Sequence, residues 1–170
     1  KVEKVIEEIG LKGLLSVDEA IKVILRDAYA PVETGRDGIR EAADLAVQYD
    51  IPIIIHNAAG CKEVVFEVAR KLGSRLIAAH SSHATFTQEE IAVNIQKLKD
   101  LGAVIDVCCG DYFIAKNLCP ADYLEVTLNL IENGLVDLIS TDFMAGNWDP
   151  LLLIVKKAVE EKRRVLEARF

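Results

Sequence analysis

A short apolar run that ends in a polar side chain recurs along the chain and limits its possible folds more than any other feature. The first copy, residues 51–57, reads Ile-Pro-Ile-Ile-Ile-His-Asn. Three later runs, at residues 75–80, 103–109 and 137–142, end in His, Cys and Asp. Uninterrupted apolar runs rich in β-branched residues are typical of strands buried on both faces, as in a parallel sheet.

The segments between these runs have the periodicity of amphipathic helices. Apolar side chains recur at helical spacing in residues 61–72 and 91–101, and Gly73 and Gly102 follow them as stop signals. The second of these helices is expected to begin at residue 88. Further helices are expected at residues 1–9, 37–49, 121–132 and 151–170, with a loop at 30–35 that contains Pro31 and Gly35. Alternating strands and helices predict an α/β protein with a parallel sheet.

Composition and charge narrow the function classes. The 170 residues are 51% hydrophobic and carry a formal charge of −7, and this acidity argues against nucleic acid or an anionic membrane as the partner. Neither an apolar run long enough for a membrane span nor a signal peptide is apparent. The four cysteines lack zinc-finger spacing and are interpreted as free thiols. We therefore expect a cytoplasmic protein that acts on a small molecule and can form homo-oligomers.

Two histidines and a carboxylate end three of the predicted strands. His56, His80 and Asp142 would meet at one edge of a parallel sheet, and nitrogen and oxygen donors of this kind suit zinc, manganese, iron or nickel. A metal there would acidify water, and the carboxylate would accept the proton. The alternative for each residue alone is a side chain bonded to nearby backbone. Asp106, just before a strand end, is a candidate buried orienting group.

Residues 16–25 fit two local structures. Ser16 and Glu19 have the spacing of a capping box, which predicts a helix that begins at about residue 17. The apolar run at residues 20–25 also fits a short strand that places Lys22 and Arg26 on one face. The periodicity alone leaves both structures open.

Four segments resemble the second half of the amidohydrolase superfamily, in particular its phosphotriesterase and dihydroorotase-like branches. They are Ile21-Lys22-Val23, Ile55-His56-Asn57-Ala58-Ala59, Ala79-His80-Ser81, and Ser140-Thr141-Asp142-Phe143 with Gly146. The resemblance covers about residues 20–150. It implies one domain over residues 1–170, a parallel (β/α) barrel of TIM type present only in part, from about strand four to strand eight. It also implies a strand at Lys22.

The same resemblance implies a site with two divalent metals, zinc or else manganese, iron or nickel. Carboxylated Lys22 would bridge the metals, His56 and His80 would bind the second, and Asp142 would bind the first and act as general base. Two further candidates rest on position alone: Arg26, on the Lys22 face, would bind a substrate carboxylate or form a salt bridge at the rim, and His83, in the loop after a strand end, would bind substrate or be an exposed loop histidine. The family's His-x-His pair is absent from these residues, so we expect strands one to three on a segment outside this sequence.

These expectations describe a metal-dependent hydrolase that cleaves an amide, cyclic amide, lactone or ester with metal-activated water. Phe143 and Trp148, in the loop after the last strand, would either line the pocket or pack the loop. One alternative function is an inactive half-barrel that serves as a binding or structural module. Another is an aldolase or isomerase that uses Lys22 as a Schiff-base lysine without a metal.

Overall fold

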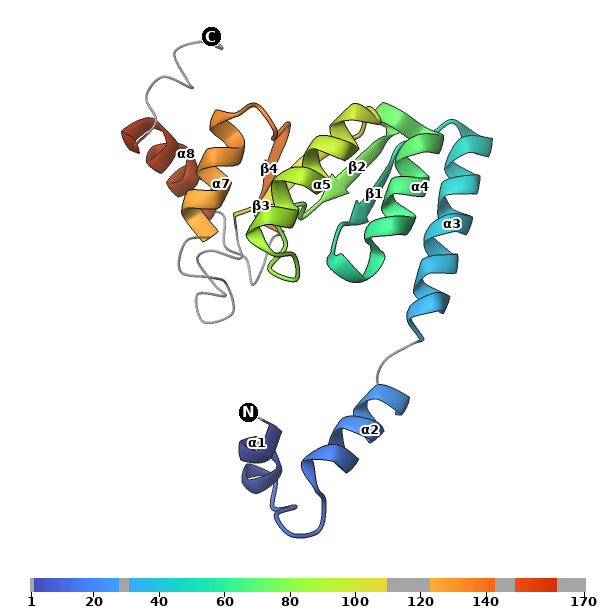
Figure 1. Cartoon of the computed structure of the whole chain (residues 1–170), viewed down its shortest axis with the longest axis vertical. Coiled ribbons are helices and arrows are strands. Elements are labelled where there is room, and N and C mark those ends of the chain that lie inside the picture. Colours follow the sequence, from blue (N-terminus) through green and yellow to red (C-terminus); the bar gives the residue numbers. More distant parts are fainter. Residues whose placement is uncertain (1, 28–30, 110–122, 143–148, 162–170) are drawn as a thin grey trace. The chain divides into compact units, whose positions relative to one another are not determined.

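The computed structural model describes residues 2–27, 31–109, 123–142 and 149–161 (Figure 1). The chain divides into two compact units, residues 1–38 and residues 39–170. The single domain over residues 1–170 stays a prediction. Phe143 and Trp148 lie outside the described residues. No helix in the described ranges has both the length and the apolar character that crossing a bilayer requires.

The first unit contains α1 (Val2–Glu8) and α2 (Val17–Asp27), which contact each other. Ser16 and Glu19 cap α2 reciprocally: the Ser16 N–H donates to Glu19 Oε2 at 2.9 Å, and the Glu19 N–H donates to Ser16 Oγ at 3.2 Å. The strand predicted at Lys22 is therefore wrong. The capping box satisfies backbone N–H groups at the start of a helix, and this local signal prevails over the apolar run that follows it.

Helix α3 (Val32–Tyr49) starts earlier than predicted. The loop expected at residues 30–35 is wrong from Val32 onward, because the helix begins directly after Pro31 and contains Gly35. Proline has a backbone φ that suits a helix start and lacks an N–H that the first turn leaves unpaired anyway. The Gly35 N–H already donates to the Pro31 carbonyl at 3.4 Å. Here Pro31 precedes a helix and does not mark a loop.

The second unit contains a four-stranded, all-parallel sheet in the order β1-β2-β3-β4, which confirms the predicted α/β class. Its strands are β1 (Ile53–His56), β2 (Leu76–Ala79), β3 (Val104–Cys108) and β4 (Leu138–Ser140). Its further helices are α4 (Lys62–Leu72), α5 (Gln88–Asp100), α7 (Tyr123–Glu132) and α8 (Asp149–Glu161), with short 3₁₀ turns η1 (Ala59–Cys61) and η2 (Gly73–Arg75).

Two predicted helices lie partly outside the described residues, at 121–122 and 162–170. The start predicted for α5 is confirmed: Thr87 Oγ1 accepts a hydrogen bond from the Glu90 N–H at 3.3 Å, and Glu90 Oε2 accepts one from the Thr87 N–H at 3.0 Å. This is a complete capping box. It places the first turn of α5 directly after the loop that leaves the end of β2.

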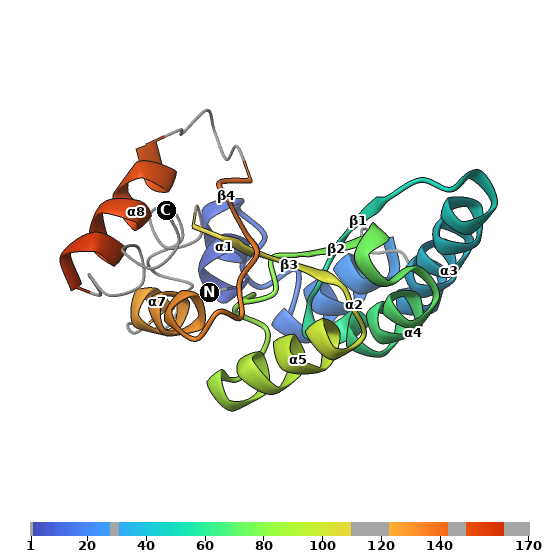
Figure 2. The ribbon, with the colours of Figure 1, turned by 90° about the horizontal axis from the view of Figure 1, so that it is seen from above.

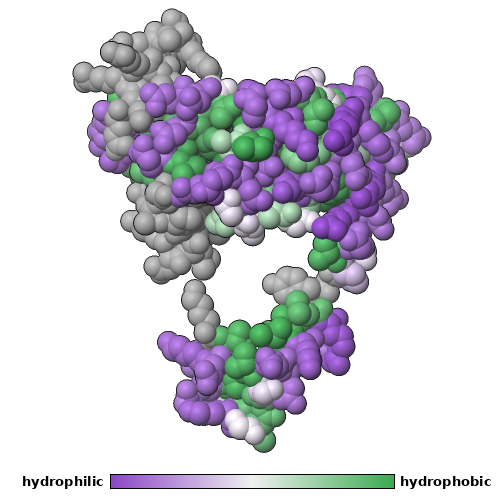
Figure 3. All heavy atoms as spheres, in the orientation of Figure 1, coloured by the Kyte–Doolittle hydropathy of each residue, from purple (hydrophilic) through white to green (hydrophobic). Residues whose placement is uncertain are grey.

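The hydrophobic core lies between one face of the sheet and the helices. Figures 1 and 2 show α4 and α5 on the same side of β1, β2 and β3. The core-facing strand residues alternate with outward ones, as a pleated sheet requires. Those of the core are Ile55, Leu76, Ala78, Ile105 and Val107, none more than 8% exposed. The outer surfaces of the helices that cover this sheet are mostly hydrophilic (Figure 3).

The opposite face of the sheet carries the intervening side chains. Strand register pairs Ile54 with Ile77, and His56 with Ala79, so these four residues share that face. Ile54 is 67% exposed there. The polar residues predicted to form the site lie next to this face, at the carboxyl ends of the strands.

Candidate metal centre

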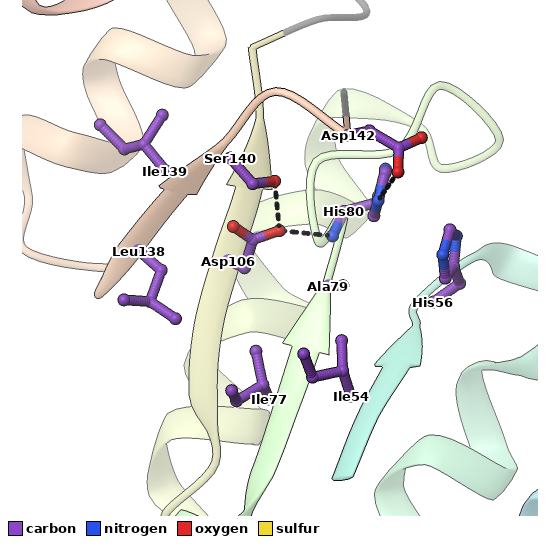
Figure 4. A pocket seen from close by; sticks show the side chains of 10 residues that line it. All are labelled: Ile54, His56, Ile77, Ala79, His80, Asp106, Leu138, Ile139, Ser140 and Asp142. Carbon is purple, nitrogen blue, oxygen red and sulfur yellow. Dashed lines mark hydrogen bonds and ion pairs between the residues drawn. The ribbon is translucent and has the colours of Figure 1, made fainter. Parts of the chain in front are cut away.

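The carboxyl ends of β1, β2 and β4 bring three of the predicted ligands together. One potential ligand atom from each of His56, His80 and Asp142 lies within 4.8 Å of those of the other two. His56 is the last residue of β1, His80 directly follows β2, and Asp142 lies two residues beyond β4. Figure 4 shows the three side chains around one mouth of the sheet. The grouping that the strand ends predicted is therefore present.

His80 reaches this mouth because its backbone departs from the strand. His56 pairs in register with Ala79, and successive side chains of a strand point to opposite faces. An extended continuation of β2 would therefore point His80 away from His56. Instead His80 has φ 58°, in the left-handed region, which non-glycine residues seldom adopt. This turn places the His80 ring against the His56 ring.

The two imidazole rings are stacked, with their centroids 4.4 Å apart and an angle of 17° between their planes. His80 is 7% exposed, whereas His56 is exposed at the end of β1. His80 Nε2 lies 3.7 Å from Asp142 Oδ1. Asp142, like His80, has a positive φ, of 54°. His80 is thus the buried centre of the cluster, with an exposed partner on either side.

The donor set can bind a single metal ion after a rearrangement. Ligand atoms about 2.1 Å from a tetrahedral zinc ion lie about 3.4 Å from one another, so a separation of 4.8 Å must shrink by about 1.4 Å. An imidazole nitrogen donates its lone pair in the ring plane, so two stacked rings cannot both point at one ion. One ring must turn for both to bind. His56 is the ring with room to turn, because it is the exposed one.

Asp106, the candidate buried orienting group, lies on β3, the strand between β2 and β4. Its side chain is 4% exposed, and its Oδ2 accepts hydrogen bonds from the His80 N–H at 3.2 Å and from Ser140 Oγ at 3.0 Å. Its backbone carbonyl accepts the Ser81 N–H at 2.9 Å. The sequence analysis missed Ser140. It is the last residue of β4, two residues before Asp142.

A second set of buried hydrogen bonds joins the ends of β1 and β2. The Asn57 N–H donates to the Ala79 carbonyl at 2.7 Å, and Asn57 Nδ2 donates to Ser81 Oγ at 3.2 Å. Ser81 Oγ in turn donates to the Ala78 carbonyl at 2.8 Å. Asn57 is 1% exposed and Ser81 is fully buried. The backbone on both sides of the two histidines is therefore fixed by bonds that water does not reach.

The other predicted site residues lie on α2 and in the loop after β2. Lys22 is exposed on α2, in the first unit. Arg26, also on α2, forms a two-pronged hydrogen bond with the neighbouring Asp27 at 2.6 Å, which raises the pKa of Arg26 and lowers that of Asp27. His83 is in the loop after β2, where its Nδ1 lies 2.9 Å from Thr85 Oγ1.

A pocket of about 360 Å³ opens beside the cluster. One part of its lining is polar and contains His56, His80, Asp106, Ser140 and Asp142, and the other part is apolar and contains Ile54, Ile77, Ala79, Leu138 and Ile139. Its described lining contains no lysine or arginine. The pocket therefore joins a potential metal site to a hydrocarbon surface.

Comparisons of the chain with protein-family models, with curated proteins and with solved structures found no match.

Proposed function

We propose that the protein is a metal-dependent hydrolase that binds one divalent transition-metal ion on His56, His80 and Asp142. It would cleave a carbonyl compound of the amide, cyclic amide, lactone or ester type. The observation that carries this proposal is the convergence of three potential ligand atoms within 4.8 Å at the carboxyl ends of parallel strands. In α/β enzymes this edge of the sheet is where catalytic groups concentrate.

The donor set supports a catalytic site and not a purely structural one. Structural zinc sites use four protein ligands, whereas catalytic sites use three and leave a position open. Two imidazoles and one carboxylate are a known catalytic combination. A bound ion supplies Lewis-acid chemistry, since it acidifies water and polarises a carbonyl oxygen. Three donors suffice for one ion. Because Lys22 lies on a helix and not at a strand end, we do not propose the carbamate-bridged pair of metals.

Each residue has a separate task in this proposal. His80, buried and held through its backbone, provides the fixed ligand, and the exposed His56 turns to complete the set. Asp142 has two carboxylate oxygens, so one can bind the ion while the other accepts the proton of the attacking water. Its side chain is 43% exposed, which leaves it open to solvent. The apolar part of the pocket would bind the hydrocarbon portion of the substrate.

We further propose that the sheet is an arc of a (β/α)8 barrel. Four parallel strands adjacent in sequence order, with α4 and α5 on one face, are the arrangement found in such barrels. The exposed Ile54 lies on the face that would point toward the barrel axis. The proposed barrel and the proposed ligands at its strand ends are both implied by the resemblance to the amidohydrolase superfamily.

The test begins with protein stripped of metal by a chelator and titrated with zinc and with cobalt in a calorimeter. We expect one ion per chain, lost in His80→Ala and retained in His83→Ala. His83 is the matched control because it is the chain's third histidine and lies outside the cluster. The loaded protein is then assayed on nitrophenyl esters, lactones and cyclic amides. Absence of binding by the wild type, or equal loss in both variants, would overturn the proposal.

An inactive binding or structural module that uses no metal is the second candidate. The stacking of the two histidine rings favours it, because the rings must move before both can bind an ion. Absence of zinc binding by the wild type would support this candidate. The Schiff-base alternative finds no support in the position of Lys22, which is exposed on a helix.

A further inference from the structure

We propose that Asp106 is a positioning residue that holds His80 in its left-handed conformation and fixes the β4 segment that carries Asp142. The inference rests on the metal site proposed above. A single carboxylate oxygen, Oδ2, accepts hydrogen bonds from the His80 N–H at 3.2 Å and from Ser140 Oγ at 3.0 Å. Asp106 thus connects β2 and β4 from the strand between them (Figure 4).

Burying the Asp106 carboxylate costs folding free energy. Asp106 is 4% exposed, and both groups that donate to its Oδ2 are neutral. A carboxylate is expensive to bury without a cation, so an aliphatic residue at this strand position would serve packing better. The two hydrogen bonds from ligand-bearing segments are what an aliphatic side chain would not provide.

The His80 backbone needs such a support. A non-glycine residue with φ near 58° is strained relative to the extended conformation. The hydrogen bond to Asp106 Oδ2 binds its N–H, and the Asp106 carbonyl binds the N–H of the following Ser81 at 2.9 Å. Two successive N–H groups are therefore held by one residue. Without Asp106, the segment can relax toward an extended form that points the ring away from His56.

The Ser140 contact extends the support to the third ligand. Ser140 ends β4, and its carbonyl also accepts hydrogen bonds from the Cys109 N–H at 2.8 Å and from Cys109 Sγ at 3.1 Å. The segment that leads to Asp142 is thus fixed through both its side chain and its backbone. Partners that orient metal ligands typically change metal affinity by about 10–100-fold when they are removed.

Asp106→Ala, Asp106→Asn and Val107→Ala test the inference. Asparagine keeps an oxygen that can accept both hydrogen bonds, whereas alanine removes it. Val107 is the matched control, since it is fully buried on the same strand and faces the core on the other side of the sheet. The first readout is the nuclear Overhauser contact between the His56 and His80 rings in metal-free protein. The second is the zinc dissociation constant of stripped protein.

We expect Asp106→Ala to lose the ring contact and to bind zinc about 10–100-fold more weakly, and Asp106→Asn to recover most of both. Val107→Ala should lower the melting temperature and change neither readout. The inference is overturned if Asp106→Ala keeps the wild-type ring contact, or if Val107→Ala weakens zinc binding equally. If Asp106→Ala does not fold, Ser140→Ala replaces it, and an unchanged zinc affinity in that variant counts against the inference.

The two proposals fail in different ways. If the wild type binds no zinc, the metal-dependent function is wrong, yet the ring contact in metal-free protein still decides whether Asp106 positions His80. If the wild type binds zinc and Asp106→Ala binds it with the same affinity, the metal site stands and the positioning role is wrong.

Discussion

Replacing His80 by glycine and by alanine gives a direct measure of the backbone strain at this site. The two variants remove the same imidazole, and they differ in whether the residue tolerates φ 58°. The left-handed conformation costs an L-residue roughly 1–2 kcal/mol. Glycine loses about 0.5–1 kcal/mol more conformational entropy on folding than alanine does. The difference between the midpoints of these ranges predicts that His80→Gly is more stable than His80→Ala by about 0.75 kcal/mol.

The assay is urea unfolding of metal-free protein followed by far-ultraviolet circular dichroism, with the midpoints of the two variants compared at a common slope. Ala79→Gly is the control, because position 79 lies within β2, where glycine should be destabilising by roughly 0.5–1 kcal/mol. The sign of the glycine effect must therefore reverse between neighbouring positions. A His80→Ala protein that is as stable as His80→Gly would refute the claim that strain is stored at this residue.

Three further predictions concern packing, pH and metal removal. Ile95→Ala, at a fully buried position of α5, should lower the unfolding free energy in urea by about 2–5 kcal/mol. The hydrogen bond from the Thr87 N–H lowers the pKa of Glu90. The stabilisation that ionised Glu90 gives the fold is therefore complete above the ordinary glutamate pKa, and it is lost as the pH falls through the lowered pKa of the folded state. Glu90→Gln should reduce the loss of stability measured below about pH 4. Zinc at about 100 times its dissociation constant should add about 2.7 kcal/mol and raise the melting temperature by roughly 5–11 °C. A chelator should reverse that rise, and His83→Ala should keep it.

The strands and most helices could be predicted because their signals are local. Apolar runs of strand length, each followed by a polar residue, predicted β1 to β4, and helical periodicity predicted α4 and α5. The strand ends also predicted that His56, His80 and Asp142 would meet, because parallel strands place their carboxyl ends at one edge. Burial, periodicity and capping act over a few residues, so the sequence expresses them directly.

Lys22 shows where a longer-range expectation failed. The resemblance implied a strand there, but Ser16 and Glu19 form the capping box that the same sequence also contained. The capping box corresponds to actual hydrogen bonds, which satisfy backbone N–H groups that the start of a helix leaves unpaired. The resemblance supplied no such interaction within this segment. Arg26 was predicted to bind substrate or to form a salt bridge, and its guanidinium pairs with Asp27.

The sequence by itself determined which residues stand at the strand ends and which helices follow them. Only the tertiary structure decided the direction in which those side chains point. Alternation along β2 would have sent His80 to the face opposite His56, and the positive φ of His80 reverses that direction. That conformation is held by Asp106, 26 residues farther along the chain. A hydrogen bond between strands exists only once the sheet has formed, so no local pattern in the sequence records it.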